Sequence, residues 1–137
     1  MKKEIISVKE TKIKTRIDSN GKLCFIENNS EIPFSIKRIF YIYDVPQNET
    51  RGNHAHKICN QFFICLKGSI EVICDDGSRK KNTILNDPQK GLFVPNSIWA
   101  SQHYLMKKSI LLVLTDQDYS EDDYIKDYNN FLDYRTL

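Results

Sequence analysis

The residues with the clearest capacity for chemistry are His54 and His56, which are separated by a single alanine. Successive side chains of a β-strand point to opposite faces, so we expect the two imidazoles on one face and Ala55 on the other. Near pH 7 a neutral imidazole is both a metal ligand and a base. The pair therefore predicts either a metal site or a site that transfers protons.

The residues that follow the pair favour proton transfer over metal binding. The run H-x-H-x4-Q-x6-G, which starts at His54, resembles the first motif of the cupins, small antiparallel β-barrels with this pair inside the barrel. In metal-binding cupins a glutamate stands at the position of Gln61, and a third histidine stands where this chain has Ala100. A divalent ion would lack its anionic ligand and one imidazole, so we expect no bound metal. The alternative is a metal-dependent isomerase or oxygenase in which His103 or Cys59 joins the two histidines.

The composition is that of one globular domain, residues 1–137. Hydrophobic residues make up 40% of the chain and charged residues 28%, which suits an ordinary core. Its 20 basic and 18 acidic residues are interspersed, with a net charge of +2, which argues against a nucleic-acid partner. We find no signal-peptide pattern and no long apolar run, so we expect no membrane association. The four cysteines show no C-x-x-C spacing, which predicts reduced thiols in a cytoplasmic protein.

Short segments rich in β-branched and aromatic residues predict about ten strands. They lie within 4–16, 24–27, 34–45, 51–68, 69–74, 79–85, 92–94, 99–106 and 109–115. Turn signals at Asn20-Gly21 and at 75–78 predict two hairpins, and the apolar run at 109–115 is typical of a strand buried on both sides. We therefore expect an all-β fold, a cupin-type antiparallel β-barrel or jelly roll, with a short C-terminal helix.

The C-terminal helix is expected over residues 120–134. Ser120 precedes three carboxylates, which resembles a capping box at a helix start. The apolar residues that follow recur with helical spacing and predict an amphipathic stripe formed by Tyr124, Ile125, Tyr128, Phe131 and Leu132. We expect this stripe to pack on its own barrel, with a neighbouring subunit as the alternative.

Several longer strings resemble the sugar 3,4-ketoisomerases that act on dTDP-4-oxo-6-deoxyglucose, relatives of the deoxysugar 3,5-epimerases within the cupins. The matching strings are D-x-x-G-x-L at 18–23, FSIKRIFYIYDV at 34–45, RGNHAHK at 51–57, GLFVP at 91–95 and D-Y-x-E-x-D-Y-I at 118–125. They cover nearly the whole chain in order. The resemblance implies a dTDP-sugar substrate, no cofactor and no metal, and a homodimer that exchanges N-terminal strands. It also implies a 3-oxo-6-deoxyhexose product that leads to a 3-amino-3,6-dideoxyhexose.

Such a reaction requires a base and a hydroxyl. The base removes the C3 proton beside the C4 ketone, and returning a proton to C4 leaves the ketone at C3. A histidine with a pKa near 6.5 suits this task, and we expect His54 to be the base with His56 assisting. For the hydroxyl that moves a proton between the two oxygens we expect Tyr41. Phe40 and Tyr41 point to opposite faces, so a register error of one residue exchanges them.

The remaining site residues are expected to bind the substrate. The cationic side chains nearest the histidines in sequence are expected to bind the diphosphate. Arginine suits this role better than lysine, because its guanidinium binds phosphate through two parallel hydrogen bonds. The cationic residues are Arg51, Arg38 and Lys37, and the sugar pocket is expected to include Gln61, Trp99, His103 and Asn20.

Two departures from the family pattern leave the C4 configuration of the product, galacto or gluco, open. The family commonly has Arg or Tyr where this chain has Asn20, and His or Arg where it has Ala100. A 3,5-epimerase-like enzyme, or a binder of sugar nucleotides without activity, remains the second alternative.

Overall fold

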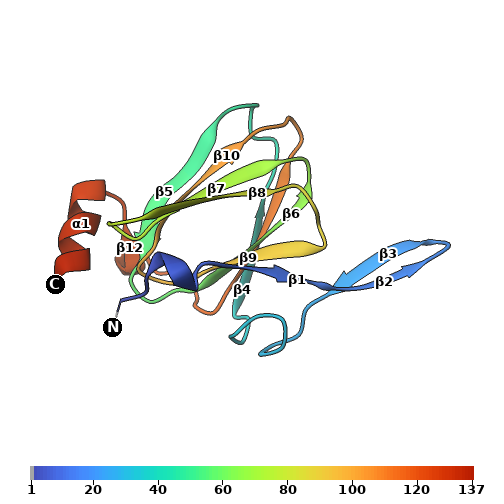
Figure 1. The fold of residues 1–137 in the computed structure, drawn as a ribbon, viewed down its shortest axis with the longest axis horizontal. Coiled ribbons are helices and arrows are strands. Elements are labelled where there is room, and N and C mark those ends of the chain that lie inside the picture. The colour runs from blue at the N-terminus through green and yellow to red at the C-terminus, as the bar shows by residue number, and fades with distance from the viewer. Residues whose placement is uncertain (1) are drawn as a thin grey trace.

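Two five-stranded antiparallel sheets lie face to face in the computed structural model, which describes residues 2–137 (Figure 1). The first sheet has the order β1 (Lys9–Lys12), β9 (Lys90–Val94), β6 (Gln61–Lys67), β11 (Ile110–Thr115) and β4 (Arg38–Ile42). The second has the order β12 (Tyr124–Ile125), β5 (Thr50–His56), β10 (Trp99–Tyr104), β7 (Ile70–Asp75) and β8 (Lys80–Leu85). A hairpin of β2 (Lys14–Asp18) and β3 (Gly21–Phe25) and the short helices η1 (Ile5–Ser7), η2 (Glu121–Asp123) and α1 (Tyr128–Thr136) complete the described chain.

This arrangement confirms the predicted all-β, jelly-roll class. All the strand pairs are antiparallel. The two large sheets are separate hydrogen-bonded units, so the expected barrel is a two-layered jelly roll rather than a closed cylinder.

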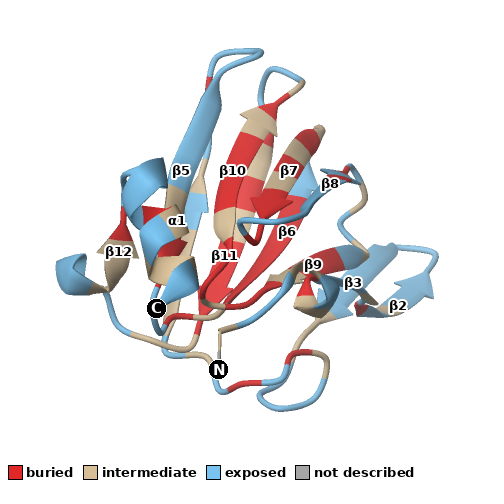
Figure 2. Ribbon diagram, turned by 60° about the vertical axis from the view of Figure 1, so that its left-hand side comes forward, coloured by how far each residue is buried: buried red, intermediate tan, exposed pale blue. Residues whose placement is uncertain are grey.

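The inner faces of the two sheets form the main core. Figure 2 shows the buried positions concentrated on β6, β7, β10 and β11, the central strands of both sheets. Alternating residues from these strands point inward, among them Phe63, Cys65, Val72, Cys74, Leu111 and Val113. Alternation with a period of two is what the strand segments of the sequence predicted.

Strand β11 is buried on both faces, as its apolar sequence predicted. Leu111 and Val113 belong to the inner core, whereas Leu114 packs in a second cluster on the outer face. Residues Ile32 and Phe34, from the loop before β4, cover that outer face. The loop therefore supplies the second layer of apolar contacts that an exposed sheet face would lack.

The hairpin β2–β3 has the predicted turn but projects from the body of the molecule (Figure 1). Asp18 closes the turn by accepting a hydrogen bond of 2.8 Å from the backbone N–H of Asn20. Ile17 and Leu23 remain 66% and 59% exposed. A two-stranded hairpin with exposed apolar residues is only marginally stable by itself, which points to a partner surface for it.

The prediction of a helix over residues 120–134 is wrong in its first half. Residues Tyr124 and Ile125 form β12 and pair with His56 and Ala55 of β5. Ser120 makes no side-chain cap, and Asp127 instead caps α1 by accepting a hydrogen bond from the N–H of Asn130 at 2.9 Å. Pairing with a sheet edge therefore outweighed the helical spacing of the apolar residues.

The remaining helix α1 packs on its own sheet, as predicted for the stripe. Phe131 is fully buried in a cluster with Ala55 and Ile125, and Trp99 packs against this cluster. Within residues 2–137, no helix has the length and apolarity required to cross a membrane.

Candidate functional site

A β-bulge in β5 places Arg51 and His54 on the same face although they are three residues apart. His54 pairs with Ala100, whereas Gly52 pairs with Ser101 and Arg51 with Gln102, so Asn53 is the extra residue. Gly52 and Asn53 both have positive φ, at 90° and 59°. A Cβ atom on Gly52 would lie 2.8 Å from Oε1 of Gln102, so glycine is required there. The string R-G-N-H thus encodes a bulge that turns a guanidinium toward an imidazole.

Both side chains face a cavity of about 280 Å³ between the sheets. The polar part of its lining consists of Arg38, Arg51, His54, Gln61, Gln102 and Tyr124, and the apolar part includes Phe40, Ile42, Phe63, Leu111 and Val113. Six strands, β4, β5, β6, β10, β11 and β12, contribute to this lining. A concavity in which polar groups converge beside an apolar wall is the usual form of a small-molecule site.

Arg38 and Arg51 give the cavity an uncompensated positive charge. Within residues 2–137, neither guanidinium forms an ion pair with a carboxylate. Arg38 instead lies 4.7 Å from the centre of the Phe40 ring and 5.3 Å from that of Tyr119. Arg51 also borders a second hollow just outside the cavity, formed around Tyr41. Two unpaired guanidinium groups that border one cavity favour an anionic ligand such as a phosphate.

His54 and His56 share the inner face of β5, as predicted, with their ring centres 5.0 Å apart. Burial, reinforced by the neighbouring His56, lowers the pKa of His54 to about 4. His54 is therefore uncharged at neutral pH, and it lines the cavity directly. An uncharged imidazole that borders a ligand cavity is positioned to accept a proton from the ligand.

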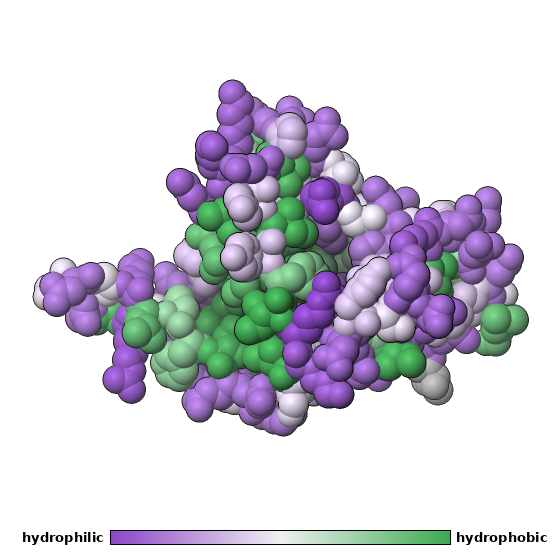
Figure 3. All heavy atoms as spheres, turned by 180° about the vertical axis from the view of Figure 1, so that it is seen from behind, coloured by the Kyte–Doolittle hydropathy of each residue, from purple (hydrophilic) through white to green (hydrophobic). Residues whose placement is uncertain are grey.

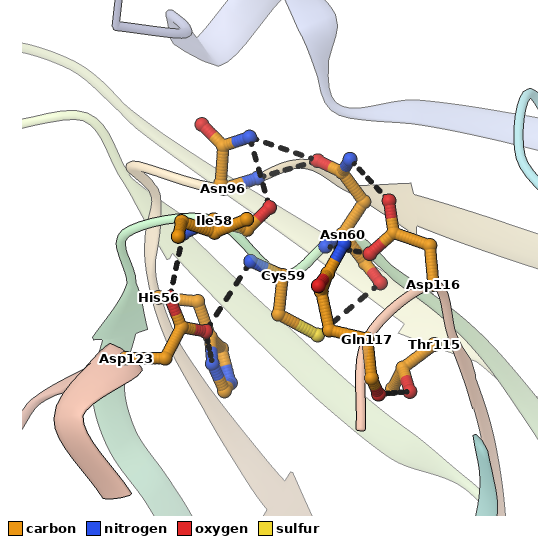
Figure 4. Close-up of polar contacts among 9 residues, drawn as sticks. All are labelled: His56, Ile58, Cys59, Asn60, Asn96, Thr115, Asp116, Gln117 and Asp123. Atoms are coloured by element: carbon orange, nitrogen blue, oxygen red, sulfur yellow. Dashed lines mark hydrogen bonds and ion pairs between the residues drawn. The ribbon is translucent and has the colours of Figure 1, made fainter. Parts of the chain in front are cut away.

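Asp123 fixes the orientation of the second histidine (Figure 4). Its Oδ2 lies 2.9 Å from Nδ1 of His56, and its carboxylate also accepts hydrogen bonds from the N–H groups of Ile58 at 2.7 Å and Cys59 at 3.2 Å. A carboxylate only accepts, so Nδ1 of His56 carries the proton and Nε2 has the lone pair. Nε2 is buried and has no partner among the described residues. Burial lowers the pKa of His56, and the hydrogen bond with Asp123 opposes that shift.

The residues around His56 do not fit a metal site. Ligand atoms of His56, Cys59 and Asp123 lie within 4.8 Å of one another. However, the Asp123 oxygens already accept three hydrogen bonds, and burial raises the pKa of the Cys59 thiol to about 12, which keeps it protonated. A metal ligand must be deprotonated and free to bind. His103 does not join the cluster, because its Nδ1 lies 2.9 Å from the Thr50 hydroxyl on the outer face.

The prediction that Tyr41 faces the cavity is wrong. Tyr41 is 64% exposed and stacks on Tyr43 at 6.1 Å on the outer face of β4, whereas Phe40 points inward. The register is one residue away from the expected one. The tyrosine that lines the cavity is Tyr124, whose ring centre lies 4.9 Å from that of His54 and 4.4 Å from that of His56.

The cavity includes only some of the other predicted binding residues. Arg38, Arg51 and Gln61 line it, together with Gln102, which was not predicted. Trp99 lies on the outer face of its sheet, with ring centres 5.3 Å from Tyr128 and 5.6 Å from Phe131.

Three further predicted binding residues, Lys37, Asn20 and His103, lie outside the lining. Asn20 is at the tip of the projecting hairpin, and His103 alternates outward from Gln102. Lys37 immediately precedes β4 and is exposed.

The chain matches a protein-family model over almost its whole length. This is the FdtA model, described as WxcM-like, C-terminal, and it matches residues 4–136. A TDP-4-oxo-6-deoxy-α-D-glucose-3,4-oxoisomerase from Aneurinibacillus thermoaerophilus is 45% identical over 118 residues, 86% of this chain and 85% of the relative.

Solved structures agree with this match. A 3,4-ketoisomerase from Helicobacter canadensis superimposes with a TM-score of 0.93 at 40% identity, over 96% of this chain and 98% of the other. The sugar 3,4-ketoisomerase QdtA from Thermoanaerobacterium thermosaccharolyticum, solved in complex with TDP, gives 0.93 at 36% identity over 97% of both chains. A histidine-to-asparagine variant of that enzyme was solved with TDP-4-keto-6-deoxyglucose. This chain therefore belongs to the FdtA family, whose matched members are sugar 3,4-ketoisomerases.

Proposed function

We propose that this protein is an isomerase that converts TDP-4-keto-6-deoxyglucose into a TDP-3-keto-6-deoxyhexose. One observation carries the proposal: a single cavity joins an uncharged histidine to two arginines without ion-pair partners among the described residues. The first group suits proton transfer at carbon, and the other two suit a diphosphate. The relatives that bind TDP and TDP-4-keto-6-deoxyglucose support the same substrate class.

His54 is the base in this proposal. The C4 ketone acidifies the proton on C3, and the His54 imidazole removes that proton to give an enediolate. Return of a proton to C4 leaves the ketone at C3, so the reaction needs no oxidant or reductant. A positioned acid–base group typically contributes about 10²–10⁴ in rate. Asp123 orients the ring of His56, which lies beside the ring of His54 on the same face of β5.

The substrate extends from the cavity to its mouth. A volume of about 280 Å³ lies just below the usual range for small-molecule sites, about 300–1,000 Å³, and it suits the sugar rather than the whole nucleotide sugar. Gln61 and Gln102 provide amide groups for sugar hydroxyls. Arg51, which borders both the cavity and the outer hollow, binds the diphosphate where the substrate leaves the cavity.

The low pKa of His54 predicts that activity persists in acid. A base must be uncharged, so activity is present above the pKa of His54 and is lost as pH falls through it. We expect kcat/KM, which reports the free enzyme, to stay level from pH 7 to about pH 5 and to halve near pH 4, the value to which burial lowers this pKa. A pH series of initial rates checks this. Loss of half the activity near pH 6.5 would contradict the buried, uncharged state of His54.

A homodimer that exchanges N-terminal hairpins is the second part of the proposal. The hairpin β2–β3 projects with Ile17 and Leu23 exposed, and Figure 3 shows an apolar hollow beside it. That hollow, on the outer face of the first sheet, is lined mainly by apolar residues, among them Ile36, Ile39, Ile64, Leu66 and Leu112. The hairpin of a second copy would cover this surface. Light scattering should give twice the chain mass of 16.1 kDa, and a mass of one chain would contradict the exchange.

We also place the enzyme in the cytoplasm. All four cysteines are free thiols, and three of them are buried. Free buried thiols suit a reducing compartment.

A further inference from the structure

We infer that the hydroxyl of Tyr124 carries a proton between the two substrate oxygens during isomerisation. This inference rests on the proposed function. It extends that function because it assigns a second proton-handling group to the reaction, in place of the outward-facing Tyr41.

The reaction requires two separate proton movements. His54 moves a proton between carbons, from C3 to C4. In addition, the C3 hydroxyl must lose its proton as the C3 carbonyl forms, and the C4 oxygen must gain one as it becomes a hydroxyl. A phenol balances this second exchange: it gives its proton to O4 of the enediolate and takes the proton of O3. Tyr124 thus ends each cycle as it began.

The lining of the cavity leaves Tyr124 as the group for this step. Of the lining residues within the described chain, Tyr124 alone carries a hydroxyl. The guanidinium groups of Arg38 and Arg51 stay protonated throughout, and the amides of Gln61 and Gln102 do not titrate. The inward positions of β4 are Arg38, Phe40 and Ile42, so that strand contributes no hydroxyl to the cavity.

Strand pairing fixes the ring beside the base. Tyr124 lies directly opposite His56 in the β12–β5 pair, so both side chains project from the same face. The ring centre is 4.9 Å from that of His54. The preceding residue, Asp123, ties this short strand to β5 and the loop after it through His56, Ile58 and Cys59.

The surroundings of the phenol suit proton exchange. Within residues 2–137, the hydroxyl of Tyr124 makes no hydrogen bond to the protein, unlike those of Tyr119 and Tyr128, which bond to Glu121 and Asp75. It is thus free to bond to a ligand. The ammonium of Lys126, which forms an ion pair with Glu121, lies 5.5 Å from the ring centre and leaves the hydroxyl itself unoccupied.

The test is the variant Tyr124→Phe, which keeps the ring and removes the hydroxyl. We expect kcat for TDP-4-keto-6-deoxyglucose to fall at least about 10²-fold, the lower end for a proton-transfer group. The dissociation constant for TDP should stay within about twofold and the melting temperature within a few degrees, because no hydrogen bond within the protein is lost. Tyr128→Phe, which removes a hydroxyl outside the cavity, should retain the parent kcat.

A second measurement separates a proton-transfer role from a structural one. In D2O, His54 still exchanges the C3 proton, so in Tyr124→Phe the ratio of C3 exchange to isomerisation should rise. A kcat within fivefold of the parent would overturn the role of Tyr124. An equal fall in exchange and isomerisation, with weaker TDP binding, would also overturn it in favour of a structural role. A parent enzyme that leaves the substrate unchanged would instead overturn the proposed function itself.

Discussion

Replacing His54 by asparagine should lower turnover of TDP-4-keto-6-deoxyglucose by about 10²–10⁴-fold, the range for loss of a general base. Asparagine has a similar shape and a polar end, but its amide does not accept a proton at neutral pH. Because the His54 side chain borders the cavity and is not part of the apolar core, the melting temperature should change little. NMR of the product in reactions quenched at set times measures turnover, and thermal unfolding measures the melting temperature.

The matched control for this variant is His103→Asn. His103 is a histidine of the adjacent strand, but it faces outward and bonds to Thr50, so its loss should leave turnover within about twofold of the parent. If His54→Asn retains more than a tenth of the parent activity, the base has been assigned to the wrong residue. Nε2 of His56, buried and without a partner in the described chain, is then the next group to examine.

Arg51→Lys should weaken the binding of free TDP by about one to two orders of magnitude, or about 1.4–2.8 kcal/mol. Lysine keeps the positive charge but loses the planar group that forms two parallel hydrogen bonds with a phosphate. Arg51 also has no carboxylate partner in residues 2–137 that would compete for it. Isothermal titration with TDP on parent and variant gives the ratio of dissociation constants.

The comparison variant is Arg79→Lys, which makes the same chemical change at an exposed position between β7 and β8. It should leave the dissociation constant for TDP unchanged. Equal affinities for the parent and Arg51→Lys would place the diphosphate elsewhere in the cavity, and Arg38 would be the cation to test next.

Local pattern was enough to predict the core of the site. Alternation along a strand correctly placed His54 and His56 on one face, and the string RGNHAHK correctly brought Arg51 to the same cavity. The physical reason for the arginine, a bulge at Asn53, was not evident, because strict alternation would have put Arg51 and His54 on opposite faces. The bulge thus brings Arg51 and His54 to one face, where alternation alone would separate them.

Tyr41 was predicted in place of Tyr124 because both the register of β4 and the strand structure of residues 124–125 depend on contacts distant in sequence. The register of β4 is set by its pairing with β11, where Tyr41 lies opposite Leu112 on the outer face. The segment around Tyr124 has helical spacing, yet it pairs with the free edge of β5. Neither partner strand is adjacent in sequence, so neither outcome was visible in the local pattern.

Other residues predicted to line the sugar pocket lie outside it because of the sheet face or hairpin on which they are found. Trp99 and His103 are on the same strand as Gln102 but alternate to the outer face, where Trp99 packs under α1. Asn20 lies at the tip of a hairpin that extends from its own body. Its predicted place near the sugar therefore depends on a second copy of the chain, which the sequence of one chain does not position.

The most direct test of the central claim is to follow TDP-4-keto-6-deoxyglucose by NMR in D2O with the purified protein. We expect the ketone to move from C4 to C3, with solvent deuterium at C3 or C4 only, because His54 is the one base that borders the cavity in the described chain. The C5 proton should remain. Incorporation of deuterium at C5 with the ketone still at C4 would identify a 3,5-epimerase and contradict the account.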